Sequence, residues 1–348
     1  MLFHLGALWR LNELGYLPKL DRVSSVSGGS ITAAVLATNW SQLDFDPSGV
    51  SREFVPTVVL PVRSLAGRTI DVWAILAGLL ILGVKGSRTA GFYRHYLLSK
   101  TTLQDLPDRP RFVFNATSLQ SGVLWRFSKP YMWDYRVGKI SQPSTELATV
   151  VAASAAFPPF LSPVFLHIRD SDYTPGSGLD LQRSPYTTRV VLTDGGVYDN
   201  LGLETAWKRY RTILISDGGG AFGPVGSPSP NWLSQVYRVL TVVDGQVRNL
   251  RKRQAIHGFL TEERTGTYWG IRSHVEDYQL SDALPCPSEQ TARLAAVATR
   301  LKRLSPEVQE RLINWGYAVC DTAMRRHVEP AAPPKGFPYP AIGVGLPT

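Results

Sequence analysis

The sequence predicts an α/β protein whose sheet, parallel or mixed, is covered by helices on both faces. Two apolar strands, RVVLT over residues 189–193 and RTILIS over 211–216, are separated by a helical pattern over 203–210. A third strand, through Val23 and Val26, leads through the tight turn SGGS into the apolar run ITAAVLAT. Apolar strands that alternate with helices favour a sheet buried on both sides, and therefore three layers.

The remaining elements follow from local patterns. A helix is predicted over residues 1–14, where Gly15 suits its end. RFVFNATSL and VLWRFS predict two strands of a hairpin or sheet edge, and a helix over 147–153 must end before two prolines. The turn-forming residues of 169–188 predict a surface loop or insertion. Further helices are predicted over 93–98, 235–254 and 289–303, and from Ser305-Pro306-Glu307 onward.

No internal repeat or linker divides the chain. With 44% hydrophobic residues, its 348 residues suffice for a sizeable core. We expect a single domain over residues 1–327, followed by a tail over 328–348. The tail contains six prolines, which predicts irregular packed chain or disorder.

Composition limits the classes of function. Two cysteines, Cys286 and Cys320, support neither a disulfide framework nor a cysteine-rich metal site. The net charge of +9 favours polyanions, either nucleic acid or an anionic membrane. The densest basic run, residues 248–253, is either a solvated helix face or a binding patch. Zinc-finger and RNA-binding signatures are missing, so no nucleic-acid partner is expected.

Two apolar segments bear on location. The N-terminal MLFHLGALWRLNELG has no charged leader and no small-residue cleavage site, so it predicts a helix rather than a secretory signal. The run VWAILAGLLILGV, residues 72–84, has 13 residues, fewer than the roughly 20 that cross a bilayer as a helix. It is either a core helix or a segment that dips into a membrane surface. We expect a cytoplasmic or peripheral membrane protein.

Ser27 is the candidate nucleophile. A serine at a sharp turn from strand to helix lies exposed above the sheet edge, and the helix N-terminus behind it favours negative charge. The usual Gly-x-Ser-x-Gly pattern is here Ser25-Val26-Ser27-Gly28-Gly29, with serine in place of the first glycine. An ordinary glycine-rich turn is the alternative.

A nucleophilic serine needs a base. The six histidines, at positions 4, 95, 167, 257, 274 and 327, have no recognisable catalytic setting. Asp194 leaves an apolar strand into two glycines, so it lies at the sheet edge where catalytic groups gather. Asp217 has nearly the same setting, and either aspartate is also compatible with a simple turn. Local physics does not separate the two.

Four motifs in order resemble the patatin-like phospholipase family: SSVSGGS, NATSLQSG, ASAAFPPFLSPV and TDGGVYDNLGLE, over roughly residues 1–220. The resemblance implies a three-layer α/β/α fold with a mostly parallel central sheet. It also implies a Ser-Asp dyad, with Ser27 as nucleophile and Asp194 as base, while Asp217 becomes a structural strand end. The elbow and oxyanion residues are then Gly28 and Gly29, and the motif of the base is supported by Gly195 and Gly196.

The resemblance implies a lipid acyl hydrolase without cofactor or metal. Its substrate is a phospholipid or another acyl-ester lipid, with peripheral contact to an anionic membrane. The family also carries a Gly-Gly-Gly-x-Arg oxyanion loop before its first helix, and Met1 stands where that loop would have ended. The expectation is therefore a weak hydrolase in this chain, or alternatively a non-catalytic member that binds a lipid or a partner.

Overall fold

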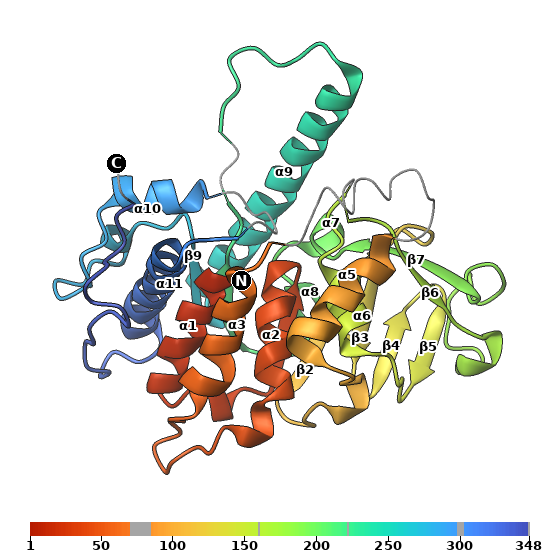
Figure 1. Cartoon of the computed structure of the whole chain (residues 1–348), viewed down its shortest axis with the longest axis horizontal. Helices are drawn as coiled ribbons and strands as arrows, with labels where there is room; N and C mark the ends of the chain where they lie inside the picture. Colours follow the sequence, from red (N-terminus) through yellow and green to blue (C-terminus); the bar gives the residue numbers. More distant parts are fainter. Residues whose placement is uncertain (70–84, 159–160, 221–222, 298–302, 347–348) are drawn as a thin grey trace. The chain divides into compact units, whose positions relative to one another are not determined.

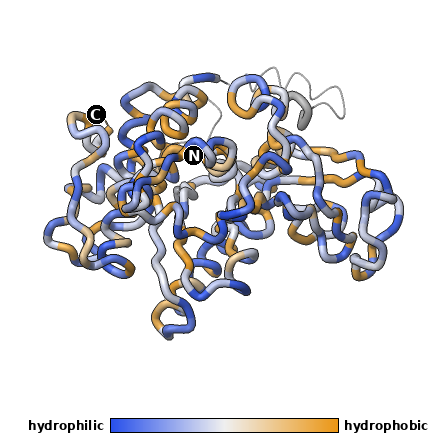
Figure 2. The backbone as a smooth tube through the Cα atoms, turned by 90° about the horizontal axis from the view of Figure 1, so that it is seen from below, coloured by the Kyte–Doolittle hydropathy of each residue, from blue (hydrophilic) through white to orange (hydrophobic). Residues whose placement is uncertain are grey.

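The structure, a computed structural model, describes residues 1–69, 85–158, 161–220, 223–297 and 303–346 (Figure 1). Backbone contacts divide the chain into two compact units. The first contains Met1, Leu11–Thr205 and Leu301–Ser305, and the second contains Leu2–Arg10, Ala206–Arg300 and Pro306–Thr348. Figure 2 shows apolar stretches of the backbone interspersed with polar ones. A single domain over 1–327 stays a prediction.

The first unit is built around a seven-stranded sheet in the order β5-β4-β3-β2-β7-β6, with β1 also paired to β2. Its strands are β1 (Arg22–Val26), β2 (Arg111–Ser118), β3 (Leu124–Ser128), β4 (Tyr131–Asp134), β5 (Gly138–Ser141), β6 (Val164–His167) and β7 (Arg189–Asp194). The predicted hairpin is confirmed, because β2 and β3 pair antiparallel.

The prediction of a mostly parallel sheet is wrong for this unit. Only β1 and β2 pair in parallel, and the other five pairings are antiparallel. Short turns join β2 to β5 in succession, and a short turn reverses the chain. The strands β7 and β8 (Thr212–Asp217), which suggested the parallel sheet, lie in different sheets, since β8 pairs in parallel with β9 (Thr265–Gly270). A continuous apolar run indicates burial on both faces, but not strand direction.

Helices α2 (Gly28–Thr38), α5 (Lys85–Tyr93), α6 (Leu147–Ser154) and α7 (Gly196–Asp199) pack on strands of this sheet, and α3 (Leu60–Ala66) packs on α2. In the sequence, α8 (Glu204–Trp207) spans the boundary between the two units. Short helical turns are η1 (Leu17–Lys19), η2 (Trp40–Gln42), η3 (Val55–Val59), η5 (Arg94–Leu98), η6 (Leu103–Asp105) and η7 (Asp170–Asp172). Both α2 and α6 are almost wholly buried. The apolar run 72–84 lies outside the described residues.

The second unit contains most of α1 (Leu2–Glu13), α9 (Trp232–Leu260), η8 (Val275–Tyr278), α10 (Ser288–Ala295) and α11 (Pro306–His327). Two glycines let α1 and α11 approach closely. An ideal Cβ on Gly6 would lie 1.9 Å from the Ile313 carbonyl oxygen, and one on Gly316 would lie 1.8 Å from that of Phe3. Only glycine allows backbones to meet at such distances.

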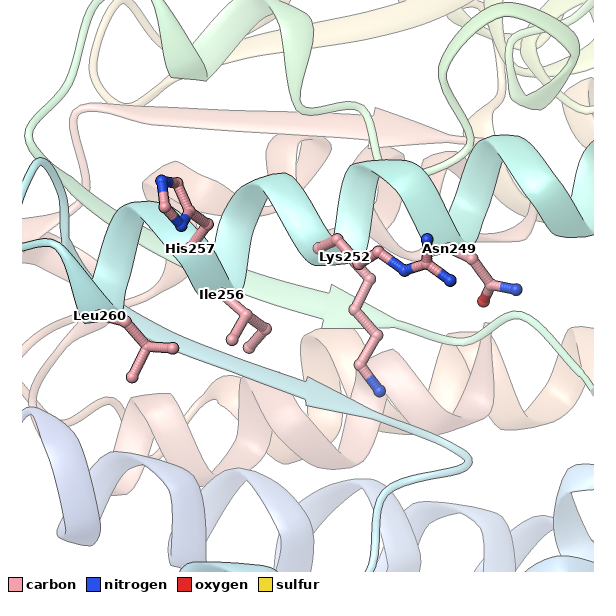
Figure 3. Close-up of a pocket in the computed structure, with 6 residues that line it drawn as sticks. Asn249, Lys252, Ile256, His257 and Leu260 are labelled. Carbon is pink, nitrogen blue, oxygen red and sulfur yellow. The ribbon is translucent and has the colours of Figure 1, made fainter.

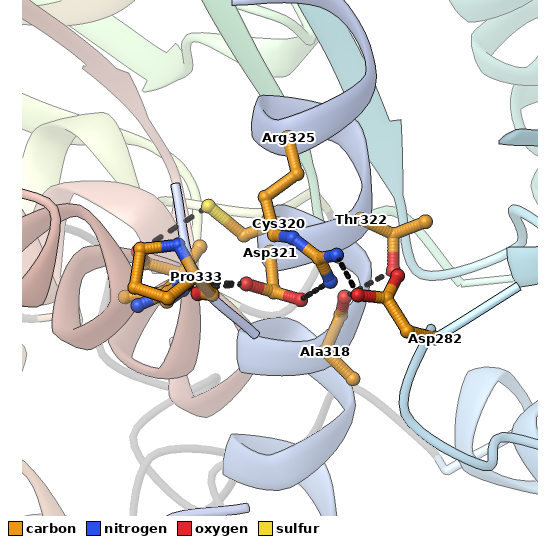
Figure 4. A network of polar contacts seen from close by, with 9 residues as sticks. Asp282, Ala318, Cys320, Asp321, Thr322, Arg325 and Pro333 are labelled. Atoms are coloured by element: carbon orange, nitrogen blue, oxygen red, sulfur yellow. Dashed lines mark hydrogen bonds and ion pairs between the residues drawn. The ribbon is translucent and has the colours of Figure 1, made fainter. Parts of the chain in front are cut away.

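A buried ion-pair network joins α1 to α11 within the second unit (Figure 4). Arg10 Nη2 lies 2.7 Å from Asp321 Oδ1, and both side chains are 1% exposed. Arg325 contacts the same carboxylate at 3.3 Å and Asp282 at 2.5 Å. Charges this deeply buried are tolerated because each has a partner of opposite sign.

The tail packs on this unit as irregular chain in its described part, 328–346. Arg10 Nη2 donates to the Pro333 carbonyl at 2.9 Å. Asn314 of α11 donates to the Tyr339 carbonyl at 2.8 Å and accepts from the Tyr339 N–H at 3.0 Å. Of the two alternatives open for the tail, packed irregular chain is the one observed.

Candidate active site

Ser27 occupies the turn between β1 and α2. Its backbone has φ 52° and ψ −130°, a left-handed conformation that costs a residue with a side chain on the order of 1–3 kcal/mol. Its side chain makes no capping hydrogen bond to α2 and is half-buried. A strained serine whose hydroxyl is not used to cap the helix is typical of a nucleophile elbow.

Asp194 is the last residue of β7 and is 2% exposed. Its Oδ1 accepts a hydrogen bond from the Gly196 N–H at 2.7 Å. Its main-chain N–H donates to the Ala156 carbonyl at 3.0 Å, and its carbonyl accepts from Thr117 Oγ1 at 2.8 Å. The Gly196 N–H therefore holds the Asp194 carboxylate, and the other two hydrogen bonds hold the Asp194 main chain.

The two strand ends meet on one side of β2. Val26 of β1 pairs with Asn115, and Asp194 of β7 pairs with Ala116, the next residue along β2. Both strands lie on the side of β2 opposite β3, and they run toward each other because one is parallel and the other antiparallel to β2. Neighbouring Cα atoms are about 3.8 Å apart, so the fold brings the segments that carry Ser27 and Asp194 together.

One carbonyl joins these segments. The Ser154 oxygen, at the end of α6, accepts hydrogen bonds from the N–H groups of Ser27 and Gly195, both at 3.2 Å. The two nitrogens are thus no further apart than twice that distance. Ser154 Oγ also accepts from Ser27 N–H at 3.3 Å and donates to the Asn115 carbonyl at 2.7 Å. Ser154 therefore fixes the main chain at Ser27 relative to that at Gly195.

Buried hydroxyls lie beneath the elbow. Ser30 Oγ lies 3.0 Å from Ser25 Oγ and 2.8 Å from Ser154 Oγ. Asn115 Nδ2 donates to Ser24 Oγ at 2.9 Å and to the Ser25 carbonyl at 3.0 Å. Ser25, which replaces the first glycine of the usual elbow pattern, therefore contributes a hydrogen-bond acceptor rather than only a small side chain.

The glycines near Ser27 and Asp194 differ in how much space they leave for a side chain. An ideal Cβ on Gly195 would lie 2.3 Å from the Asn115 carbonyl oxygen, so a side chain would push β7 away from β2. A Cβ on Gly28 would lie 3.3 Å from the Met1 nitrogen, a tight but less severe approach. Gly28 and Gly29 are the first two residues of α2, where helix N–H groups lack intrahelical partners.

Tyr93, at the end of α5, was not singled out from the sequence. It is fully buried, and its hydroxyl has no hydrogen-bond partner among the described residues. Burial raises the pKa of Tyr93 well above its ordinary value, and the negative charge of Asp194 raises it further. The phenol therefore lies within electrostatic reach of the candidate base.

Asp217, the rival aspartate, lies in the second unit and has a different environment. It is 4% exposed, and its Oδ2 accepts from the Tyr268 hydroxyl at 2.8 Å. Its Oδ1 accepts from the Gly219 N–H at 2.9 Å and lies 3.9 Å from Arg248 Nε. The Asp217 carboxylate is therefore surrounded by hydrogen-bond donors and a guanidinium group that compensate for its burial.

Among the described residues, no three or more His, Cys, Asp or Glu side chains are placed to hold a metal ion together. His4 contacts Ser216 Oγ at 2.8 Å within the second unit, where burial lowers its pKa to about 3. That histidine is therefore neutral across the physiological range.

Ser154, Ser30 and Asn115 were not singled out from the sequence, although each lies inside one of the four motifs. The available signal was a polar residue within an otherwise apolar or small-residue run, because a buried polar group must find a partner.

Comparison with known proteins gives a family. A model of the patatin-like phospholipase family matches residues 1–207. The matched residues include all four motifs and end with α8. A comparison with curated proteins found no match.

Proposed function

Because the chain belongs to the patatin-like phospholipase family, we propose that it is a lipid acyl hydrolase in which Ser27 is the nucleophile and Asp194 the base. The observation that carries the dyad is the Ser154 carbonyl, which accepts from both Ser27 and Gly195. Substrate, on this proposal, is a phospholipid or another acyl-ester lipid. The dyad uses neither metal nor cofactor, and no nucleic acid is involved.

The reaction has two steps. Ser27 Oγ attacks the ester carbonyl carbon while its proton passes to the Asp194 carboxylate. The tetrahedral intermediate collapses, the ester C–O bond breaks, and the departing alkoxide takes up that proton. Water then attacks the acyl-enzyme, Asp194 accepts its proton, and the fatty acid leaves as Ser27 regains its hydroxyl hydrogen.

Burial suits Asp194 to the role of base. A carboxylate is a weak base toward a serine hydroxyl in water, whereas one removed from water takes up a proton more readily. Asp194 is 2% exposed, so its carboxylate is largely removed from water, which supports its assignment as the base.

The negative charge that develops on the substrate oxygen lies, on this proposal, against the N-terminus of α2. There the Gly28 N–H and the positive end of the helix dipole are available as stabilising groups. Removal of a single oxyanion donor typically lowers the rate by about 100 to 1000-fold. The net charge of +9 supports peripheral contact with an anionic membrane, where such substrates reside.

The dyad is tested by substitution. Ser27→Ala and Asp194→Asn should each lower kcat/KM for a p-nitrophenyl acyl ester by about 1000-fold or more, because each removes an essential group. Hydrolysis of a phospholipid in mixed micelles should fall in parallel. A fluorophosphonate probe should label the parent chain and not Ser27→Ala.

Asp217→Asn is the matched control, since it changes the same side chain at the end of a similar strand. It should lower thermal stability and leave the kcat of the folded fraction within a few-fold. The reverse pattern, with Asp217→Asn inactive and Asp194→Asn active, would show that Asp217 rather than Asp194 is the base. A parent chain that binds phospholipid without hydrolysing it would favour the non-catalytic alternative.

A further inference from the structure

The first part of α9 exposes an unusual number of apolar side chains. Eight large apolar residues in residues 232–243, here called the α9 apolar segment, are between 41% and 68% exposed. They are Trp232, Leu233, Val236, Tyr237, Val239, Leu240, Val242 and Val243. The segment contains one charged residue, Arg238. Exposed apolar residues that cluster in this way mark an interaction site.

The width of the apolar surface around the helix indicates which kind of partner it contacts. At about 3.6 residues per turn, the eight side chains cover more than half of the helix circumference. A helix that packs on a protein surface needs an apolar stripe only about 100° wide. A lipid phase, in contrast, surrounds an embedded helix on several sides.

The α9 apolar segment has its own helix cap. The Asn231 side chain accepts from the N–H groups of Leu233 and Ser234 at 3.0 and 3.3 Å, which caps the helix where it begins. This end of α9 extends away from β9, α10 and α11 of the same unit (Figure 1). Trp232 and Tyr237 supply the aromatic rings that favour the boundary between lipid and water.

The segment is too short to cross a bilayer. Twelve residues of helix extend about 18 Å, against a hydrocarbon core of about 30 Å. None of the helices in the described part of the chain is long and apolar enough for a membrane span. A helix of this kind lies in the plane of the interface.

Positive charge follows the apolar segment along the same helix. Arg251, Lys252 and Arg253 lie in its second half. Arg251 donates to Gln254 at 3.2 Å and the Lys252 ammonium lies 4.9 Å from the centre of the Tyr268 ring, whereas Arg253 is exposed. Figure 3 shows Lys252 beside Ile256 and His257 in a shallow depression along this half of α9. Apolar side chains next to cationic ones complement a surface of acyl chains and anionic headgroups.

We propose that the α9 apolar segment inserts into the headgroup region of an anionic lipid surface, while the exposed Arg253 pairs with a lipid phosphate. The inference rests on the lipid hydrolase function proposed above, because it supplies the contact that holds such an enzyme on its substrate. It assigns membrane binding to a surface separate in sequence from Ser27 and Asp194.

The test measures vesicle binding apart from catalysis. All chains carry Ser27→Ala, so that bound lipid is not hydrolysed, and are sedimented with vesicles of phosphatidylglycerol and phosphatidylcholine or of phosphatidylcholine alone. The parent should prefer the anionic vesicles, and added salt should weaken that binding. Leu233→Ser/Val239→Ser should lower partitioning about tenfold or more, because two apolar side chains leave the lipid.

Leu60→Ser/Leu179→Ser is the matched control. Leu60 and Leu179 are 53% and 74% exposed in the first unit, against 60% and 59% for Leu233 and Val239. The control should bind vesicles as the parent does, and both double variants should keep the parent's melting temperature. With Ser27 intact, both should hydrolyse a water-soluble p-nitrophenyl ester at the parent rate.

Three results would overturn the inference. The first is that the parent binds no vesicles, and the second is that the parent and Leu233→Ser/Val239→Ser bind equally. The third is a parent dimer that this variant dissociates without loss of vesicle binding, which would assign the segment to a second copy of the chain. Vesicle binding that depends on α9 without any ester hydrolysis would support the inference and reject the proposed function.

Discussion

Tyr93 illustrates how a single buried residue links stability to the candidate site. Its hydroxyl is buried without a partner among the described residues, and the Asp194 charge contributes to its raised pKa. A tyrosine whose pKa is raised in the folded state retains its proton there while the unfolded chain loses it. The folded state then binds more protons, so stability falls as the pH rises above the unfolded value of about 10.

We therefore predict that Tyr93→Phe removes part of the alkaline loss of stability. Between pH 9 and 11, the urea midpoint of the parent should fall more steeply than that of Tyr93→Phe, because phenylalanine has no proton to lose. At pH 7 the two should differ little, since the buried hydroxyl lacks a described partner. Parallel midpoints across the whole range would contradict the prediction.

The residues of the site were predictable to different degrees. Ser27 and Asp194 became candidates because a polar residue between an apolar strand and glycines is visible in the sequence, and the family resemblance selected Asp194 as the base. Asp194 and Asp217 were not distinguishable locally, since their difference lies in distant partners such as Tyr268 and Arg248. Ser154 takes its position between two strand ends from tertiary structure alone.

The elements show where local patterns suffice. The boundaries of α1 and α6 and the start of α11 were predicted closely, because glycines and prolines define them, whereas α2 begins at Gly28, inside the turn predicted over residues 27–30. The four-residue strands β4 and β5 were missed, since so few residues carry little periodicity. The helix predicted over 235–254 is longer in the structure, as α9. The helices predicted over 203–210 and 289–303 are shorter, as α8 and α10, and residues 298–302 lie outside the described part of the chain.

Sheet direction was the main error at this scale. An apolar strand reads alike whether its neighbours run parallel or antiparallel, so direction depends on the connections. In this sheet β7 lies between β2 and β6 and opposes both. The three-layer arrangement stays a prediction.

The contact between α1 and α11 gives a prediction for helix packing. Gly316→Ala should lower the free energy of unfolding by at least about 2–3 kcal/mol, because its Cβ would lie 1.8 Å from the Phe3 carbonyl oxygen. Gly245→Ala, in the interior of α9, meets nothing within 4 Å and should stabilise by about 0.5–1 kcal/mol. Denaturant unfolding of both variants measures the two effects. Equal changes would show that the close approach is not limiting.

At the scale of the whole molecule, the chain passes back and forth between its two units. The first unit takes residues from the start, middle and late part of the sequence, and so does the second. Segments this interleaved have no single cut at which one unit separates from the other. The single domain predicted over 1–327 therefore remains our expectation.

Cooperative unfolding tests that expectation. Calorimetry should show one transition with equal calorimetric and van't Hoff enthalpies. Gly316→Ala, in the second unit, should lower the temperature at which Ser27 of the first unit stops reacting with a fluorophosphonate by as much as it lowers the transition. Two separate transitions, or labelling that persists after the second unit has unfolded, would show two domains.

The α9 apolar segment also bears on how the sequence can diverge. A side chain such as Ser154 Oγ meets three groups at fixed distances, so almost any replacement disturbs a neighbour. The eight apolar side chains of α9 are held by no such set of distances, because their exposed surfaces meet solvent or lipid. In relatives, the corresponding helix is free to exchange leucine for valine or phenylalanine while it stays apolar, so family resemblance should fade there first although the function persists.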